Sequence, residues 1–322
     1  MSESGLPETP EPTRSSQRLT IPGCPLYVEA TAPERPDLPP ALFVHGLGGS
    51  SQNWSLLMRS LAGDVDGHAV DLPGFGQSPP PDDADLSVSA HVWAVVEYLE
   101  LSGRGPVHLF GNSLGGAVAT RLAALRPDLV RTLTLISPAL PEVPPQTSAL
   151  PTALLAVPGV PGLFTRLTRG QPAEQQTEAL LELCYGDPGL IDAQRRAEMV
   201  AEYQRRQALP YAMDVLARSA RGVVRAYTER GPRALWRQAE QVRVPVLLVY
   251  GLRDKLVSYR MARRAGQAFR DSRLLVLPEA GHVAMMEYPE LVAGQFRQLL
   301  AEASARSAGA AEGSAQVPVA QP

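Results

Sequence analysis

Short apolar runs alternate with longer amphipathic stretches along the first half of the chain. The run from Ala41 to Val44 is continuously apolar, as expected of a strand buried on both faces of a sheet. Similar short runs occupy 68–70, 107–110, 133–136, 244–250 and 274–277. Apolar residues recur at helical spacing in 88–101 and 114–125. This alternation predicts a parallel sheet with helices on both faces.

The alternation stops between about residue 139 and residue 243. That stretch has no convincing strand pattern and contains helical segments broken by Pro and Gly, namely 173–183, 193–207 and 213–228. A final helix begins at Pro289, because proline is well tolerated in the first turn of a helix. A helical insertion between strands of a sheet is the pattern of a lid.

Both ends of the chain are poor in large apolar residues. Residues 1–17 and 305–322 cannot bury enough surface to offset the entropy of ordering, so we expect disordered tails there. The domain organisation predicted from these patterns is a core made of 18–138 and 244–304, with a helical cap over 139–243.

Composition restricts the class of protein further. Hydrophobic residues make up 44% of the 322 residues and the formal net charge is -3, which favours a globular protein without a nucleic-acid partner. Cys24 and Cys184 lie far apart in the sequence, which argues against a disulfide framework and favours a reducing compartment. Neither a signal peptide nor an apolar stretch of membrane-spanning length is present, so we expect a cytoplasmic protein with no integral membrane segment. The sequence does not indicate an oligomeric state.

The strongest candidate for chemistry is Ser113, within the pattern Gly111-x-Ser113-x-Gly115. The preceding residues read as a buried strand and the following ones as a buried helix. A serine on such a tight strand-to-helix turn adopts a strained backbone, and flanking glycines remove side chains that would clash. The turn exposes the hydroxyl at the start of a helix, which suits a nucleophile.

A serine nucleophile needs a base, and the chain contains five histidines. His282 follows the last predicted strand and is the best candidate, with Asp254, just past the preceding strand, orienting it. The order Ser113, Asp254, His282 is the one expected of an elbow serine on a parallel sheet. The remaining histidines are interpreted as structural or as bracing a glycine loop: His45, His68, His91 and His108.

Two other acids are candidates for the orienting role. Asp71 precedes a Pro-Gly turn, so we expect it to accept hydrogen bonds from nearby backbone amides. Glu142 lies soon after the strand at 133–136 and is the alternative partner for the histidine.

A stabilised oxyanion requires backbone N–H donors near the nucleophile. The glycine-rich stretch from Gly46 to Gly49 lets the backbone approach a ligand, so we expect the N–H groups of Leu47 and Leu114 to form the oxyanion hole. The alternative interpretation of this stretch is a flexible turn before a helix that begins near Trp54.

These motifs together resemble those of the α/β-hydrolase superfamily over about residues 20–303. The resemblance rests on five stretches: His45-Gly46-Leu47-Gly48-Gly49, the run Asp71 to Ser78, Gly111 to Gly116, Gly251-x-x-Asp254 and Gly281-His282. It implies an α/β fold with a mostly parallel, doubly wound sheet of about eight strands, a helical cap inserted after the sixth, and neither cofactor nor metal. It excludes relatives whose nucleophile is aspartate, because residue 113 is serine.

The substrate is less closely defined. The stretch from Gly111 to Gly116 is similar to the elbow of hydrolases that cleave carbon–carbon bonds in ring-fission products, whereas Gly46 to Gly49 is closer to carboxylesterases and lipases. We therefore favour a carboxylesterase acting on small or medium acyl esters through an acyl-enzyme. Thioester hydrolysis, acyl transfer, carbon–carbon bond cleavage and a non-catalytic ligand-binding role remain alternatives.

The predicted cap contributes two further expectations. Its apolar residues either pack on the core or line a pocket for an apolar group of a small-molecule substrate: Leu150, Leu154, Leu155, Val157, Leu163 and Phe164. Its arginine pairs, Arg195-Arg196 and Arg205-Arg206, alternate with acids and are interpreted as a solvated helix face.

Overall fold

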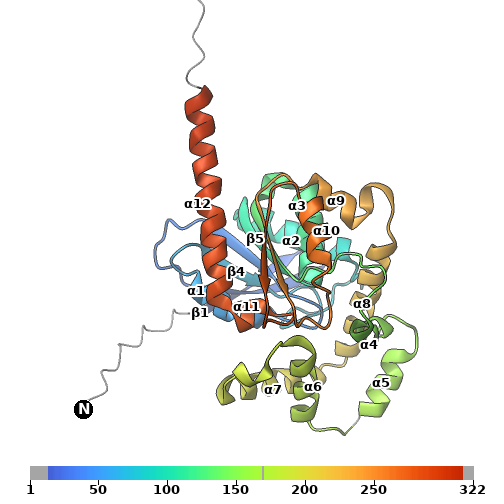
Figure 1. Ribbon diagram of the computed structural model, residues 1–322. Helices are drawn as coiled ribbons and strands as arrows, with labels where there is room; N and C mark the ends of the chain where they lie inside the picture. Colours follow the sequence, from blue (N-terminus) through green and yellow to red (C-terminus); the bar gives the residue numbers. More distant parts are fainter. Residues whose placement is uncertain (1–13, 169, 315–322) are drawn as a thin grey trace, which may run out of the picture.

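An eight-stranded, mostly parallel sheet forms the centre of the molecule in the computed structural model, which describes residues 14–168 and 170–314 (Figure 1). Across the sheet the strands follow the order β1-β2-β4-β3-β5-β6-β7-β8. Their bounds are β1 Arg14–Ile21, β2 Cys24–Thr31, β3 Pro40–Val44, β4 Asp66–Val70, β5 Val107–Asn112, β6 Val130–Ile136, β7 Val246–Gly251 and β8 Ser272–Leu277.

The sheet is antiparallel only at the edge where the chain enters it. β1 pairs with β2 and β2 pairs with β4 in antiparallel fashion, and the other pairings are parallel. Every residue of β5 and of β7 is buried, as expected of central strands covered on both faces. The predicted α/β fold and its mostly parallel sheet are confirmed.

Helices cover both faces of this sheet. The α-helices are α1 Ser55–Ser60, α2 Val88–Ser102, α3 Leu114–Leu125, α4 Leu150–Leu154, α5 Val160–Thr168, α6 Ala173–Cys184, α7 Ala193–Gln207, α8 Ala212–Thr228, α9 Leu235–Gln241, α10 Met261–Ala268, α11 Ala284–Glu287 and α12 Pro289–Ser314. Short 3-10 helices occupy Ser51–Trp54, Pro127–Leu129, Thr147–Ala149, Pro188–Leu190 and Gly231–Arg233.

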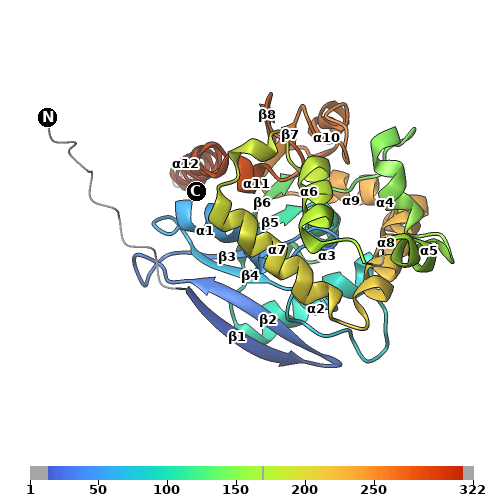
Figure 2. The same ribbon diagram turned by 90° about the horizontal axis from the view of Figure 1, so that it is seen from below.

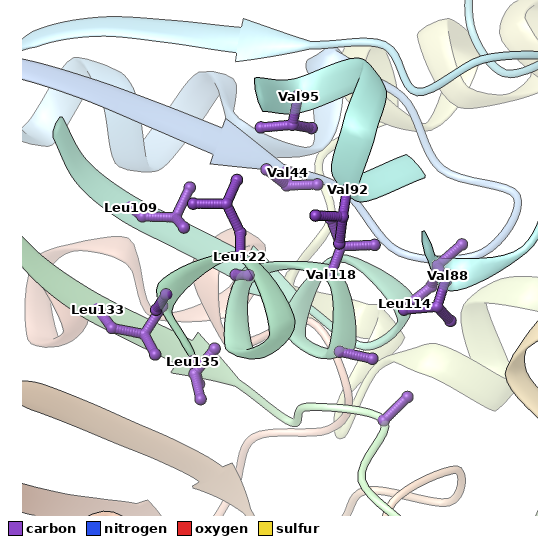
Figure 3. Close-up of a cluster of buried hydrophobic side chains, with 14 of the residues drawn as sticks. Val44, Val88, Val92, Val95, Leu109, Leu114, Val118, Leu122, Leu133 and Leu135 are labelled. Carbon is purple, nitrogen blue, oxygen red and sulfur yellow. The ribbon is translucent and has the colours of Figure 1, made fainter. Parts of the chain in front are cut away.

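Successive residues of each strand point to opposite faces and so supply two hydrophobic cores. Leu42 and Val44 of β3 pack with α2, α3, α9 and α10, whereas Ala41 and Phe43 pack with α1, α11 and α12. Figure 3 shows the first core, where Val118 and Leu122 of α3 meet side chains of α2 and of the strands. The contacts in the first core hold α3 against the sheet, directly after the end of β5.

The stretch between β6 and β7, here termed the insertion, contains helices and no strand among its described residues. Helices α4 to α8 lie together at one end of the sheet (Figures 1 and 2). Helix α9 also falls within the predicted cap at 139–243, but it packs against α3 and α10 in the layer that covers the sheet. The buried residues Leu235 and Ala239 of α9 belong to the first core. Helix α9 therefore packs with the sheet layer and not with α4 to α8.

The expected tails differ from the observed elements at both ends. Residues 14–17, placed in the N-terminal tail, form the start of β1, because pairing with β2 satisfies their backbone groups. Residues 305–314 continue α12, in keeping with the high helix propensity of alanine. The rest of both expected tails, 1–13 and 315–322, lies outside the described residues.

No helix within residues 14–168 and 170–314 combines the length and the apolar character needed to cross a bilayer.

The first core makes α3 the central helix of the fold, and its contribution to stability can be measured. Leu122 is 0% exposed, so Leu122→Ala should lower the free energy of unfolding by about 2–5 kcal/mol through lost burial and a residual cavity. Leu125 of the same helix is 52% exposed, and Leu125→Ala should change it by less than about 0.5 kcal/mol. Urea unfolding followed by circular dichroism measures both variants. Equal losses would contradict this packing.

Candidate active site

Ser113 occupies the single residue between β5 and α3 and has an unusual backbone conformation. Its φ is 53° and its ψ is −116°, a backbone conformation that residues other than glycine rarely adopt. Its N–H donates to the Ile136 carbonyl at 3.2 Å, and its own carbonyl accepts from the Ala139 N–H at 2.9 Å. Backbone hydrogen bonds to both sides of the β6 terminus thus hold the strained turn.

The glycines around Ser113 are required by close backbone approaches. A Cβ atom on Gly115 would lie 2.1 Å from the Val44 carbonyl oxygen, and one on Gly111 would lie 2.4 Å from the Gly115 carbonyl oxygen. Neither neighbour is a flexible side chain that could move away. The start of α3 therefore packs directly on the end of β3.

His282 and Asp254 form a buried hydrogen-bonded pair on loops that follow β8 and β7. The Nδ1 atom of His282 lies 2.9 Å from Oδ2 of Asp254. The other carboxylate oxygen, Oδ1, accepts from the backbone N–H groups of Leu256 at 2.7 Å and Val257 at 2.9 Å. An ionised Asp254 fixes the histidine tautomer with the proton on Nδ1, which leaves Nε2 free to accept a proton.

The electrostatic environment keeps Asp254 ionised. Burial acts to raise the pKa of Asp254, but the adjacent His282 and the Val257 N–H lower the pKa below its usual value. The carboxylate can therefore support a positive charge on the imidazole ring.

Hydrogen bonds connect the serine turn to the histidine loop. The side-chain amide of Asn112 donates to the backbone carbonyls of Ile136 and His282, both at 3.0 Å. On the other side, a Cβ on Gly46 would lie 3.1 Å from the Ser113 Cβ, so the glycine loop passes directly beside the serine. The turn, the histidine loop and the glycine loop thus meet at one point.

The two expected oxyanion donors lie on this junction. Leu47 follows Gly46 in the glycine loop, Leu114 is the first residue of α3, and both line one cavity together with Ser113 and His282. His45 braces the loop: its Nε2 accepts from the Leu72 N–H at 2.9 Å, and its Nδ1 lies 2.7 Å from the Gly46 carbonyl oxygen. Burial lowers the pKa of His45 to about 4, so the ring is neutral.

Neither alternative acid is hydrogen-bonded to His282. Asp71 accepts from the backbone N–H groups of Ser51 at 2.6 Å and Gln77 at 2.7 Å, which matches the bonding expected of it at a turn. Glu142 accepts from the Ser258 N–H at 3.4 Å. The acid that the fold brings to His282 is Asp254.

The other histidines are buried in the core, as the sequence indicated. His68 Nδ1 lies 2.5 Å from the Tyr98 hydroxyl, and His108 Nδ1 lies 2.9 Å from the Thr132 hydroxyl. Neither ring nitrogen of His91 hydrogen bonds to a described residue. Burial lowers the pKa of His68 and His108 to about 4 and that of His91 to about 3.

The cavity over Ser113 has a volume of about 2100 Å³ and is walled mostly by the insertion. The expected apolar residues divide between two positions. Leu150, Leu154, Leu155 and Phe164 line the cavity. Val157 and Leu163 do not line it, although exposure does not separate the two groups, because Leu150, Leu154 and Phe164 are also 45%, 50% and 41% exposed. The arginines divide too, because Arg195, Arg205 and Arg206 line the cavity, whereas Arg196 hydrogen bonds to Glu178.

Glu287, which the sequence analysis did not single out, joins the insertion to the histidine loop. Its carboxylate accepts from the Gly186 N–H at 2.7 Å and from the Gly281 N–H at 2.8 Å. Beside it, the His282 N–H donates to the Cys184 carbonyl at 2.7 Å. The only sequence signal was an acid five residues after His282, in an otherwise apolar stretch.

No group of three or more His, Cys, Asp or Glu side chains within residues 14–168 and 170–314 is arranged to hold a metal ion.

Comparisons with known proteins agree with this fold. A family model described as the alpha/beta hydrolase fold matches residues 39–289, so the chain belongs to this family. It is 28% identical over 284 residues to a pimeloyl-[acyl-carrier protein] methyl ester esterase of Neisseria meningitidis, covering 83% of this chain and 97% of that protein.

A second relative is longer than the matched region. The chain is 30% identical over 266 residues to the dihydrolipoyllysine-residue acetyltransferase component of the acetoin cleaving system of Pseudomonas putida. The match covers 81% of this chain and 63% of that protein, so the chain spans about three fifths of the relative's length.

Among solved structures, the fold resembles that of 2-hydroxy-6-oxo-6-phenylhexa-2,4-dienoate hydrolase from a Rhodococcus strain. The TM-score is 0.73 with 19% sequence identity, covering 90% of this chain and 99% of that one. At this identity the likeness shows the fold alone.

The Glu287 contacts predict a measurable effect on stability. Glu287→Ala leaves the Gly186 and Gly281 N–H groups without their acceptor, and each unsatisfied buried group costs about 1–3 kcal/mol. We expect a loss of about 2 kcal/mol or more in the free energy of unfolding. The control is Glu279→Ala, which removes an exposed ion pair with Arg253 and should cost about 0–1 kcal/mol. Similar losses in the two variants, measured by urea unfolding, would refute the bridging role.

Proposed function

We propose that this protein is a serine carboxylesterase that works through an acyl-enzyme on Ser113. The observation that carries the proposal is that His282, whose Nδ1 lies 2.9 Å from Oδ2 of Asp254, lines the same cavity as Ser113 on its strained turn. A hydroxyl at such a turn has no evident packing role, whereas it is well placed for attack on a bound ester.

In the acylation step, the Ser113 hydroxyl attacks the ester carbonyl carbon and transfers its proton to Nε2 of His282. Asp254 stabilises the resulting imidazolium through the hydrogen bond to Nδ1. The tetrahedral intermediate collapses when its bond to the alcohol oxygen breaks, and the alcohol leaves with the proton from Nε2. An acyl group is then esterified to Ser113.

Deacylation repeats the sequence with water. His282 accepts a proton from the water molecule as its oxygen attacks the acyl carbon, and the proton is returned to the Ser113 oxygen as the acid is released. In both halves the N–H groups of Leu47 and Leu114 donate to the developing oxyanion. A single donor of this kind is worth about 100- to 1,000-fold in rate.

An ester with an apolar acyl group is the substrate class that the cavity favours. The insertion acts as a cap in this proposal and presents Leu154, Leu155 and Phe164 to the cavity. The match to the methyl ester esterase supports ester hydrolysis further, because it covers 97% of that relative.

Hydrolysis of p-nitrophenyl esters from acetate to palmitate tests the proposal. We expect turnover of short or medium acyl chains, and at least a 1,000-fold lower kcat for Ser113→Ala, because substitution removes the nucleophile. Absence of turnover across the series would contradict the proposal that the protein is a general carboxylesterase. Acyl thioesters, acyl acceptors other than water, and ring-fission dienones would then separate the other reactions. Unchanged turnover in Ser113→Ala would exclude the acyl-enzyme.

The role of Asp254 is tested by comparison with Glu142. Asp254→Asn should lower kcat by roughly 10,000-fold, because an amide cannot stabilise the imidazolium or hold the required tautomer. Glu142→Gln should leave kcat within about tenfold of the original protein, since its carboxylate bonds to the Ser258 N–H. The opposite ranking of the two variants would make Glu142 the acid of the triad.

A further inference from the structure

Arg206 lies in the last turn of α7 and reaches from the insertion to the glycine loop. Its Nη1 atom donates to the carbonyl of Gly48, the residue that follows Leu47. It lines the same cavity as Ser113 and His282. A permanent positive charge is therefore placed beside the proposed oxyanion hole.

The hydrogen-bonding capacity of Arg206 is largely unused within the described residues. A guanidinium group has five N–H donors. Among residues 14–168 and 170–314, its hydrogen bond is the one to Gly48, and no ion pair there includes it. Its other close neighbour is the Tyr203 ring, with the guanidinium carbon 5.6 Å from the ring centroid.

The adjacent Arg205, in contrast, has several hydrogen-bond partners. Arg205 bonds to both carboxylate oxygens of Glu202 at 2.7 Å and to the Gly76 carbonyl at 2.8 Å. Glu202 is the nearest acid on the same helix face as Arg206, one turn earlier, and it is already engaged by Arg205. Glu202 still acts on the Arg206 charge through space and raises its pKa, but no carboxylate of the described residues forms an ion pair with Arg206.

The Arg206 side chain is partly buried beside the glycine loop. Burial lowers the pKa of Arg206, and its charge contributes to the lowered pKa of His45 in the glycine loop. A partly desolvated cation that has no direct ion pair gains from an anion that enters the cavity. A guanidinium also matches the geometry of carboxylate and phosphate groups.

We propose that Arg206 binds an anionic group, carboxylate or phosphate, carried by the ester substrate. This inference rests on the proposed esterase function and deepens it. Because Leu150, Leu154 and Phe164 line other parts of the same cavity, the preferred substrate combines an apolar portion with one negative charge near the ester. The anion belongs either to the acyl portion or to the alcohol portion.

Two substrate series distinguish these sources. Monoethyl esters of malonate, succinate, glutarate and adipate carry the charge on the acyl portion, with diethyl esters of the same acids as neutral references. Butyryl glycerol 3-phosphate carries it on the alcohol portion, with monobutyrin as its reference. A pH-stat measures kcat/KM for each substrate with the full-length protein.

We expect one anionic series to be hydrolysed with a higher kcat/KM than its neutral reference. Arg206→Gln should lower this ratio by about 10- to 100-fold, the value of a charge-assisted hydrogen bond. Arg206→Lys, which keeps the charge, should restore part of it. The control Arg196→Gln removes an arginine of the same helix that does not line the cavity, and it should leave the ratio unchanged.

Two results would overturn the inference. Equal kcat/KM for charged and neutral esters in the original protein is one. An equal loss on both substrate types in Arg206→Gln is the other, because it would make Arg206 a brace for the Gly48 carbonyl only. Failure of the esterase proposal is distinguishable, since it would appear as no Ser113-dependent turnover of the neutral esters.

Discussion

The start of α3 and the end of β3 approach each other so closely that no side chain fits between them. A methyl group at Gly115 would lie 2.1 Å from the Val44 carbonyl oxygen, closer than any real contact of that kind. This approach leaves one residue to join β5 to α3, and that residue, Ser113, takes a positive φ of 53°. The same approach brings the glycine loop beside the Ser113 Cβ. The position of Ser113 and that of its proposed oxyanion donors therefore have a common steric origin.

The insertion contributes to the site as well as to the cavity. The Cys184 carbonyl accepts from the His282 N–H at 2.7 Å, and the Gln146 side chain donates to the Asp254 carbonyl at 3.0 Å. Glu287 bonds to backbone groups of both the insertion and the histidine loop. The segment that shapes the cavity thus also holds the proposed base and acid. Changes to these inserted residues should therefore affect chemistry and substrate preference together.

Local sequence predicted the parts of the fold that rest on strong apolar patterns. The strands from β3 to β8 contain short apolar runs, and Ser113, Asp254 and His282 stand at or shortly after the ends of three of them. β1 and β2 were implied by the family resemblance but not located. The residues from Arg14 to Ile21 are mostly polar and become a strand only through pairing with β2. Their strand structure depends on tertiary pairing, and the pattern of apolar and polar residues in this stretch does not indicate it.

The contributions of Arg206 and Glu287 could not be predicted for a related reason. Arg206 has the sequence environment of a solvated helix face, with acids and a second arginine nearby. It becomes a cavity residue only because α7 crosses the end of the sheet (Figure 2). Glu287 acquires its role from two backbone N–H groups, one of them about a hundred residues away in sequence. Such roles depend on which segments of the chain meet in the fold. The types of the residues alone do not indicate this.

The acyl-enzyme on Ser113 is the central claim, and covalent labelling tests it most directly. The intact protein would be treated with a p-nitrophenyl alkylphosphonate, which phosphonylates an activated serine, and then analysed by mass spectrometry with peptide mapping. The account predicts one adduct per chain, on the peptide that contains Ser113, formed at a rate that depends on His282 and Asp254. It also predicts no adduct in Ser113→Ala. An adduct on another residue, or labelling that persists in Ser113→Ala, would contradict it.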